Sequence, residues 1–245
     1  MYLQDYFWFL GALGVCMIIC FIANSRVNKT FARYDTVSTS SNMTGYDAVV
    51  RLMKSNDIYD ISIGRISGKL SDNFNPKARM INLSDSTYGS NSVAAVAVAA
   101  HEMGHVLQER KGYVFYKIRT AIVPVVNFGT RLSLPLVLIG LVIDLIISST
   151  TASIGFYIAM VGVILYGGSF LFTLITLPVE FNASRRAKKM LVEEGILNED
   201  EVQGASKVLS AAAMTYLASS LVSLLYFLRF FVYVLTLFGR RNNRR

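Results

Sequence analysis

Long apolar segments restrict the fold of this chain more than any other feature of its sequence. A helix needs about 20 mostly apolar residues to cross the roughly 30 Å hydrocarbon core of a bilayer. The segments that meet this requirement lie at 6–23, 121–147, 154–177 and 211–238. Hydrophobic residues make up 53% of the 245 residues and charged residues only 16%, a composition too apolar for an ordinary soluble domain. We therefore expect a mainly α-helical, polytopic membrane protein with three to four transmembrane helices.

Three of these segments carry features that affect how they cross the bilayer. The first, 6–23, has no basic region before it and no small-residue cleavage site, which favours a retained anchor over a removed signal peptide. Pro124 and Pro135 predict bends in the second segment. Arg229 lies within the fourth, so we expect either a broken helix there or a helix followed by an interfacial one.

The chain has a net charge of +8, and the placement of that charge is informative. Basic residues cluster beside the apolar segments, at 26–33, 185–189 and 240–245. This is typical of the positive-inside bias, so we expect contact with the lipid bilayer and no nucleic-acid partner. The same bias places 24–120 and 178–210 in the cytoplasm and the uncharged loop 148–153 outside. The side of the C-terminus stays open, because a fourth simple span would place the final arginines outside.

The segment between the first two apolar runs is large enough for a water-exposed unit. The predicted elements are a helix over Ser41–Asn56, two short strands at about 61–66 and 80–83, and a helix from Val93 to about Glu109. A turn at Asn75–Pro76 lies between the strands, which predicts a short β-hairpin or small sheet. Thr44 and Ser92 can cap the two helices. The apolar run 93–100 is too short to cross a membrane and is typical of a buried core helix.

The second of these helices carries the sequence HEMGH at 101–105. Residues four apart differ by about 400° of helical rotation, so His101 and His105 leave the same face and can reach one tetrahedral zinc ion. Glu102 lies beside them, placed to take a proton from water that the metal activates. The chain has no other histidine, which a polar turn on a helix surface does not explain. The sequence therefore predicts one Zn²⁺ site with two histidine ligands and Glu102 as its catalytic base.

A catalytic zinc ion needs a third protein ligand, and with no histidine left a carboxylate must supply it. Glu180 is favoured, because the two spans before it return the chain to the side of the membrane that holds the histidines. Glu109 lies one turn beyond His105 and is less well placed to complete a tetrahedron, and Asp144 lies near the far end of a span. We expect Glu180 to begin a polar helix just past the third span. A carboxylate at a helix N-terminus is also stabilised by the helix dipole, so Glu180 could have this role without binding a metal.

Peptide hydrolysis also requires a donor for the oxyanion that develops on the carbonyl under attack. Tyr216, Arg185 and Arg186 are the candidates for this catalytic role. Tyr216 could equally be an interfacial aromatic residue, and the arginines could be topological charges. The strand at 79–83 could pair with an extended substrate or belong to the core.

Several longer blocks carry a family resemblance. NSVAAVAVAAHEMGHVLQ, with LSDNFNP and INLS before it and TLPVEFNASRRA and AAAMTYLAS after it, resembles the bacterial neutral zinc metallopeptidases of the YugP-like membrane group. More loosely, HExxH, two spans and a Glu-bearing helix are similar to the HtpX heat-shock proteases and the CAAX prenyl protease. The resemblance implies a gluzincin site in the bacterial plasma membrane that faces the cytoplasm. It also implies that His101, His105 and Glu180 are zinc ligands and that Glu102 is the general base.

One position departs from the wider gluzincin pattern. Gluzincins often have an Asp four residues after the ligand Glu, and this chain has Ser184 there. The resemblance therefore implies that a neutral hydrogen bond supports one of the histidines.

Three functions stay open at this point. The leading one is a single membrane-embedded metallopeptidase domain over 1–245, an endopeptidase that hydrolyses membrane or membrane-near polypeptides. The second is an intramembrane protease of the site-2 type, which needs HExxH inside a span and an Asp ligand such as Asp144. The third is a non-catalytic zinc protein that acts as a scaffold or chaperone.

Overall fold

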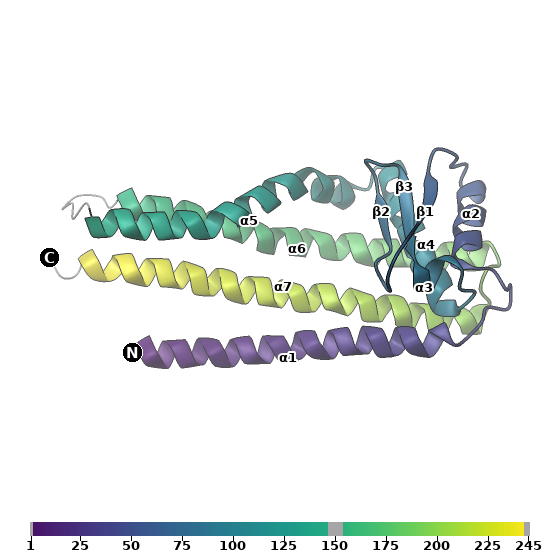
Figure 1. Cartoon of the computed structure of the whole chain (residues 1–245), viewed down its shortest axis with the longest axis horizontal. Helices are drawn as coiled ribbons and strands as arrows, with labels where there is room; N and C mark the ends of the chain where they lie inside the picture. Colours follow the sequence, from purple (N-terminus) through teal and green to yellow (C-terminus); the bar gives the residue numbers. More distant parts are fainter. Residues whose placement is uncertain (1, 147–153, 243–245) are drawn as a thin grey trace. The chain divides into compact units, whose positions relative to one another are not determined.

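The computed structural model describes residues 2–146 and 154–242, and the chain is mainly helical (Figure 1). The described elements are α1 (Tyr2–Asp35), α2 (Gly45–Ser55), β1 (Ser62–Ile66), β2 (Asn73–Asn75), β3 (Met80–Ser84), α3 (Asp85–Tyr88), α4 (Val93–Arg110), α5 (Val114–Ile146), α6 (Ile154–Glu193) and α7 (Glu199–Asn242). They form two compact units, each built from distant parts of the sequence. The helical unit comprises Met1–Cys20, Ile118–Thr176 and Tyr216–Arg245, and the sheet-bearing unit comprises Phe21–Lys117 and Leu177–Thr215.

Four helices, α1, α5, α6 and α7, are long and apolar enough to cross a membrane, which confirms the prediction of a polytopic fold. Only 6% to 22% of each apolar window is buried inside the protein, as expected for side chains that face lipid. In the helical unit α5 and α6 approach closely, because a Cβ added at Gly140 would lie 2.4 Å from the carbonyl oxygen of Gly155. Pro124 and Pro135 lie inside an unbroken α5. The predicted outer loop 148–153 lies outside the described residues.

Two of the long helices continue further than the sequence predicted. Helix α7 runs unbroken through Arg229, so the predicted break in the fourth apolar segment is wrong. Helix α6 continues past Pro178, so the prediction that Glu180 begins a separate polar helix is also wrong. A proline inside a long helix removes only one backbone hydrogen bond, which neighbouring groups can replace. Glu180 therefore lies within α6, the helix that also contains the third apolar segment.

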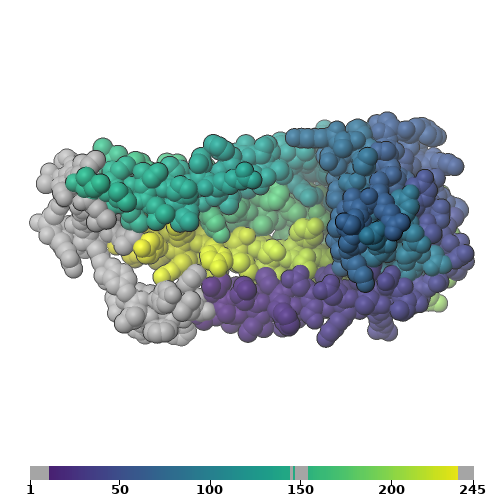
Figure 2. Space-filling view, viewed as in Figure 1, coloured from purple at the N-terminus to yellow at the C-terminus, as the bar shows by residue number. Residues whose placement is uncertain are grey.

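The sheet has three strands in the order β1-β3-β2. Strands β2 and β3 form an antiparallel hairpin, whereas β1 pairs with β3 in parallel, with Ile63 opposite Ile81. The two predicted strands therefore pair, but not as a hairpin. The sequence left open whether 79–83 pairs with a substrate or belongs to the core. Because β3 has a neighbour on both sides, it is the central strand of the sheet, as the second alternative requires. In Figure 2 the residues of α2 and the sheet, drawn in blue, form much of the visible face of this unit.

Helix α4 forms the centre of the sheet-bearing unit. Its N-cap is Ser92, whose hydroxyl accepts a hydrogen bond from the backbone N–H of Ala95 at 3.1 Å. Its apolar residues are buried in one cluster with residues of α2, the sheet, α6 and α7. Thr44 caps α2 with a reciprocal bond from Asp47, as the sequence predicted. The structure thus confirms that α4 is a buried core helix, and α4 is not among the four candidate spans of the described residues.

Candidate metal centre

Helix α4 and helix α6 bring three side chains of the sheet-bearing unit together. The Nε2 atom of His101 lies 3.1 Å from Oε2 of Glu180, and the Nε2 atom of His105 lies 3.7 Å from the same oxygen. The three ligand atoms all lie within 4.8 Å of one another. The Glu180 side chain is only 3% exposed, and the two imidazoles are 15% and 9% exposed. The structure therefore brings together the three side chains that the sequence predicted as metal ligands.

A buried amide fixes the orientation of His105. The Nδ1 atom of His105 lies 3.0 Å from Oε1 of Gln108. The Nε2 atom of Gln108 donates to the carbonyl of Val179 at 2.7 Å and to Oδ1 of Asn182 at 3.1 Å, so its oxygen faces the imidazole as an acceptor. The proton of His105 then lies on Nδ1, which leaves the lone pair of Nε2 directed at Glu180 and free for a metal.

Ser184 has the same relation to His101. Its hydroxyl oxygen lies 3.1 Å from Nδ1 of His101, so the outer nitrogen of this ring is also hydrogen-bonded. This is the neutral hydrogen bond that the sequence implied at the position where gluzincins often have Asp. Both Nε2 atoms thus face the carboxylate, which is the arrangement that a metal between the three side chains requires.

The Gln108 contact leads to a testable prediction. Replacing Gln108 with leucine removes the acceptor that orients His105, and it also removes the side-chain donor to the carbonyl of Val179. Loss of such an outer partner typically weakens metal binding by about 10- to 100-fold, and we expect a loss of that size. Asn182→Ala removes only one of the two acceptors of the amide and should cost less. Chelator competition for zinc measures both; equal affinities of Q108L and wild type would contradict this role for Gln108.

Gly104 explains why α4 and α6 can approach closely at this point. A Cβ added at Gly104 would lie 2.6 Å from the carbonyl oxygen of Ala183. This oxygen belongs to the backbone of α6, so the clash could be removed only by moving one of the two helices. Ala183 lies between Asn182 and Ser184 on α6, so displacement of this helix would move Glu180 relative to the histidines.

We therefore predict that Gly104→Ala lowers zinc affinity and hydrolysis together. A misplacement of about 1 Å in a catalytic group costs on the order of 100-fold in rate, and we expect a loss of this order. Gly89→Ala is the matched control, because nothing lies within 4 Å of a Cβ added there. Zinc content and turnover of the two purified variants check the prediction, and wild-type values for G104A would disprove it.

Glu102 lies beside the three ligands and is almost fully buried, with 7% of its surface exposed. Burial raises the pKa of its carboxyl group to about 7, although the nearby His101 and a hydrogen bond from the backbone of Phe74 act in the opposite direction. A cation held by the histidines would act in the same direction as His101 and lower the pKa from this raised value. A carboxylate with a pKa near neutral is suited to accept and return a proton at physiological pH.

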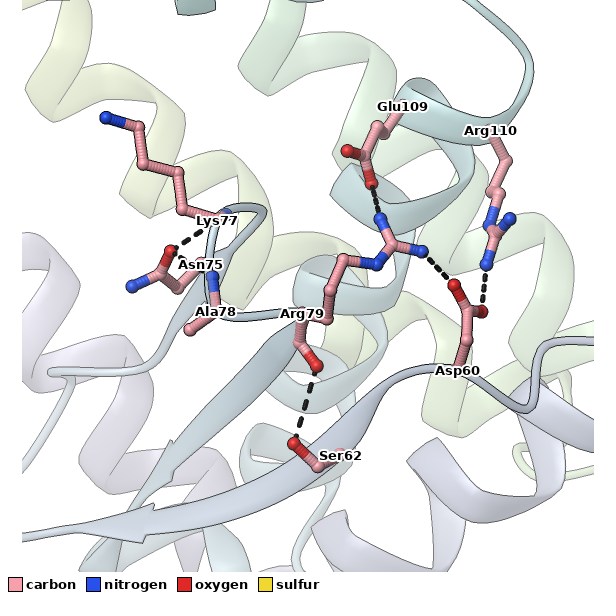
Figure 3. Close-up of polar contacts among 8 residues, drawn as sticks. All are labelled: Asp60, Ser62, Asn75, Lys77, Ala78, Arg79, Glu109 and Arg110. Carbon is pink, nitrogen blue, oxygen red and sulfur yellow. Dashed lines mark hydrogen bonds and ion pairs between the residues drawn. The ribbon is translucent and has the colours of Figure 1, made fainter.

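The structure places Glu109, another candidate ligand, in contacts away from this group. Nη1 of Arg79 donates to Oε2 of Glu109 at 2.7 Å, and Arg79 also pairs with Asp60, which in turn contacts Arg110 (Figure 3). Glu109 therefore belongs to an ion-pair network that links α4 to the chain before β1 and β3. The side chain of Asp144 lies outside the described residues.

The predicted oxyanion donors lie in different surroundings. Arg185 is exposed on α6, and within the described residues no polar contact joins it to the histidines. Arg186 is half-buried, and its Nε donates at 2.8 Å to Oδ1 of Asn182, the same atom that accepts from Gln108. Tyr216 lies on α7 in the helical unit and is 37% exposed. The catalytic roles of Tyr216 and Arg185 stay predictions.

Sequence reasoning missed Gln108 and Asn182. The only signal for Gln108 is its position three residues after His105, which puts the two side chains on neighbouring parts of one helix face. Asn182 follows Glu180 by two residues, a spacing that does not place the two side chains on one face.

A buried pair of imidazoles and a carboxylate, next to a glutamate on the same helix, is typical of zinc-dependent hydrolases. Comparison with known proteins agrees with this class. The chain belongs to the family described as "Putative neutral zinc metallopeptidase", whose family model matches residues 9–235. It is 40% identical over 234 residues to the "Putative membrane protease YugP" of Bacillus subtilis (strain 168), over 96% of this chain and 97% of that protein. No solved structure matches the chain.

Proposed function

We propose that this chain is a zinc-dependent membrane endopeptidase of the gluzincin type, which hydrolyses peptide bonds of membrane or membrane-near polypeptides. The observation that carries the proposal is the convergence of His101, His105 and Glu180, with ligand atoms within 4.8 Å of one another, beside the buried Glu102. The family match and the relative called a membrane protease support the same activity.

The donor set fits zinc better than it fits a hard cation. Two imidazole nitrogens and one carboxylate oxygen are the ligands of many catalytic zinc sites, whereas Ca²⁺ and Mg²⁺ prefer oxygen ligands alone. Three protein ligands also leave a fourth tetrahedral position for water. A Zn²⁺ ion held here would supply the Lewis acidity that makes water nucleophilic near neutral pH.

Glu102 then performs the proton transfers. Its carboxylate takes a proton from the attacking water and delivers it to the amide nitrogen as the peptide bond breaks. The buried position that raises its pKa makes the return of the proton easier than it would be from an exposed glutamate. Arg186 is oriented by Asn182, and with Tyr216 and Arg185 it is a candidate donor to the oxyanion.

We propose further that the site faces the cytoplasm. The basic clusters at 26–33 and 185–189 flank the apolar segments on the side that carries the sheet and α4, as the positive-inside bias favours. Fusion of a reporter to the loop 148–153 tests this orientation, because a periplasmic-type reporter should be active there and inactive when it is fused within 24–120 or 178–210.

The site-2-type protease and the non-catalytic scaffold each require a different arrangement of the site. A site-2-type protease needs HExxH inside a span, and α4 is not among the candidate spans within residues 2–146 and 154–242. A non-catalytic scaffold would bind zinc without using Glu102, whose burial and position would then have no role.

Substrate trapping in cells separates the endopeptidase from the non-catalytic scaffold. Glu102→Gln keeps the shape of the side chain but cannot accept a proton, so substrates should remain bound and uncut. We expect polypeptides to be enriched with E102Q relative to wild type and to be cleaved when wild type is restored. Full biological activity of E102Q with zinc still bound would instead establish a scaffold.

A further inference from the structure

A cavity lies in the sheet-bearing unit, and its lining does not include His101, His105 or Glu180. It has a volume of about 630 Å³ and is lined by residues of α1, α6 and α7. Pockets that bind small molecules commonly have volumes of about 300 to 1,000 Å³. The cavity is therefore large enough for the polar part of a lipid or for a small anion with its water.

The lining of this cavity carries positive charge only. Arg26, Arg33 and Lys207 contribute three cations, and no carboxylate is among the lining residues. Within the described part of the chain none of the three forms an ion pair, although the Arg33 guanidinium lies over the Tyr34 ring, 5.6 Å from its centroid. A fourth cation is adjacent, because Nζ of Lys188 donates at 3.2 Å to the hydroxyl of Ser206, which also lines the cavity. Three cations without a counter-charge favour an anionic ligand.

The sequence places this cavity at the level of the lipid headgroups. Arg26 follows the first apolar segment by three residues, and Phe181 follows the third by four. Lys207 precedes the fourth apolar segment by four residues. At a rise of about 1.5 Å per residue, each of the three helices therefore has a lining residue within roughly one helical turn of its apolar segment. Cations at this level are where anionic headgroups are concentrated.

The cavity lining is also amphipathic. Alongside the cations and hydroxyl groups it includes Phe181, Ala211 and Met214, and the first and last of these are exposed over 49% and 43% of their surface. A free inorganic phosphate makes no favourable contact with apolar side chains, whereas a phospholipid presents a phosphate and acyl chains together. We propose that this cavity binds the headgroup phosphate of an anionic phospholipid, with Arg26, Arg33 and Lys207 around the phosphate.

Native mass spectrometry of the full-length protein in detergent tests the proposal, with phosphatidylglycerol and phosphatidylcholine as the probes. Wild type should retain phosphatidylglycerol on the order of tenfold more than phosphatidylcholine, and R26Q/K207Q should lose this preference. R26K/K207R keeps both charges and should restore it. If the double variant fails to fold, the single variant K207Q replaces it, and it should lose part of the preference for phosphatidylglycerol.

The control R51Q/K189Q removes two cations of the same unit that do not line the cavity. It should retain phosphatidylglycerol like wild type. Equal retention by wild type and R26Q/K207Q, or an equal loss in the control, would overturn the proposal. Complete displacement of the lipid by millimolar inorganic phosphate would also overturn it, because the occupant would then be a free anion. Lipid retention does not require peptide hydrolysis, so its outcome is independent of the proposed peptidase function.

Discussion

Replacing Glu102 with glutamine is expected to abolish peptide hydrolysis while the metal stays in place. The amide is nearly isosteric with the carboxylate but cannot accept the proton of the attacking water. General acid–base catalysis contributes about 10²- to 10⁴-fold to a rate, and we expect a fall in kcat at the upper end of this range because Glu102 serves both proton transfers. Glu102 is not one of the three grouped ligands, so zinc content should not change. Cleavage of an unfolded test protein, with zinc measured on the same sample, checks both parts.

Glu109→Gln is the matched control for this variant. It makes the same chemical change on the same helix, but Glu109 pairs with Arg79 and lies outside the ligand group. Loss of a partly exposed ion pair costs at most about 1 kcal/mol of stability, so E109Q should retain zinc and turnover. An E102Q protein that hydrolyses peptide bonds as fast as E109Q would exclude Glu102 as the base.

Glu180→Gln is expected to remove zinc itself. The carboxylate oxygen lies 3.1 Å and 3.7 Å from the two Nε2 atoms and is the only anionic donor of the three-residue group. An amide oxygen is a weaker ligand without negative charge, and two histidines alone hold zinc weakly. Loss of a direct ligand should exceed the 10- to 100-fold cost of losing an outer partner, so we expect affinity to fall by more than about 100-fold. Zinc content by elemental mass spectrometry after dialysis measures this effect.

E109Q again supplies the comparison, because the sequence offered Glu109 as an alternative ligand. Zinc lost from E109Q and kept by E180Q would show that the third ligand had been assigned to the wrong carboxylate. Zinc lost from both would indicate that the ion-pair network around Arg79 supports the site from the C-terminal end of α4.

Spacing within a single helix was sufficient to predict His101, Glu102 and His105, because helical geometry alone puts the two imidazoles on one face. Glu180 lies 79 residues after His101. It was predicted as the third ligand because no histidine remained and because two spans return the chain to the side of the membrane that holds the histidines. That the carboxylate meets both histidines depends on the close approach at Gly104, which no periodicity reveals.

Features that depend on the contact between two helices or strands could not be predicted from the sequence. Gln108 orients His105 only because α6 presents a carbonyl and an amide oxygen to it. The parallel pairing of β1 with β3 was not predicted, and neither was the short strand β2, which lies on the other side of β3. The predicted break in α7 assumed that Arg229 could not lie within a long helix, but a charged residue can be accommodated there when other groups satisfy it.

Zinc-dependent hydrolysis by the purified full-length protein tests the central claim most directly. Cleavage of unfolded casein would be followed as zinc is removed with a chelator and then restored in measured amounts. We predict that hydrolysis falls in proportion to the zinc removed and returns fully when one zinc ion per chain is restored. Hydrolysis that continues unchanged in the zinc-free protein would contradict the account.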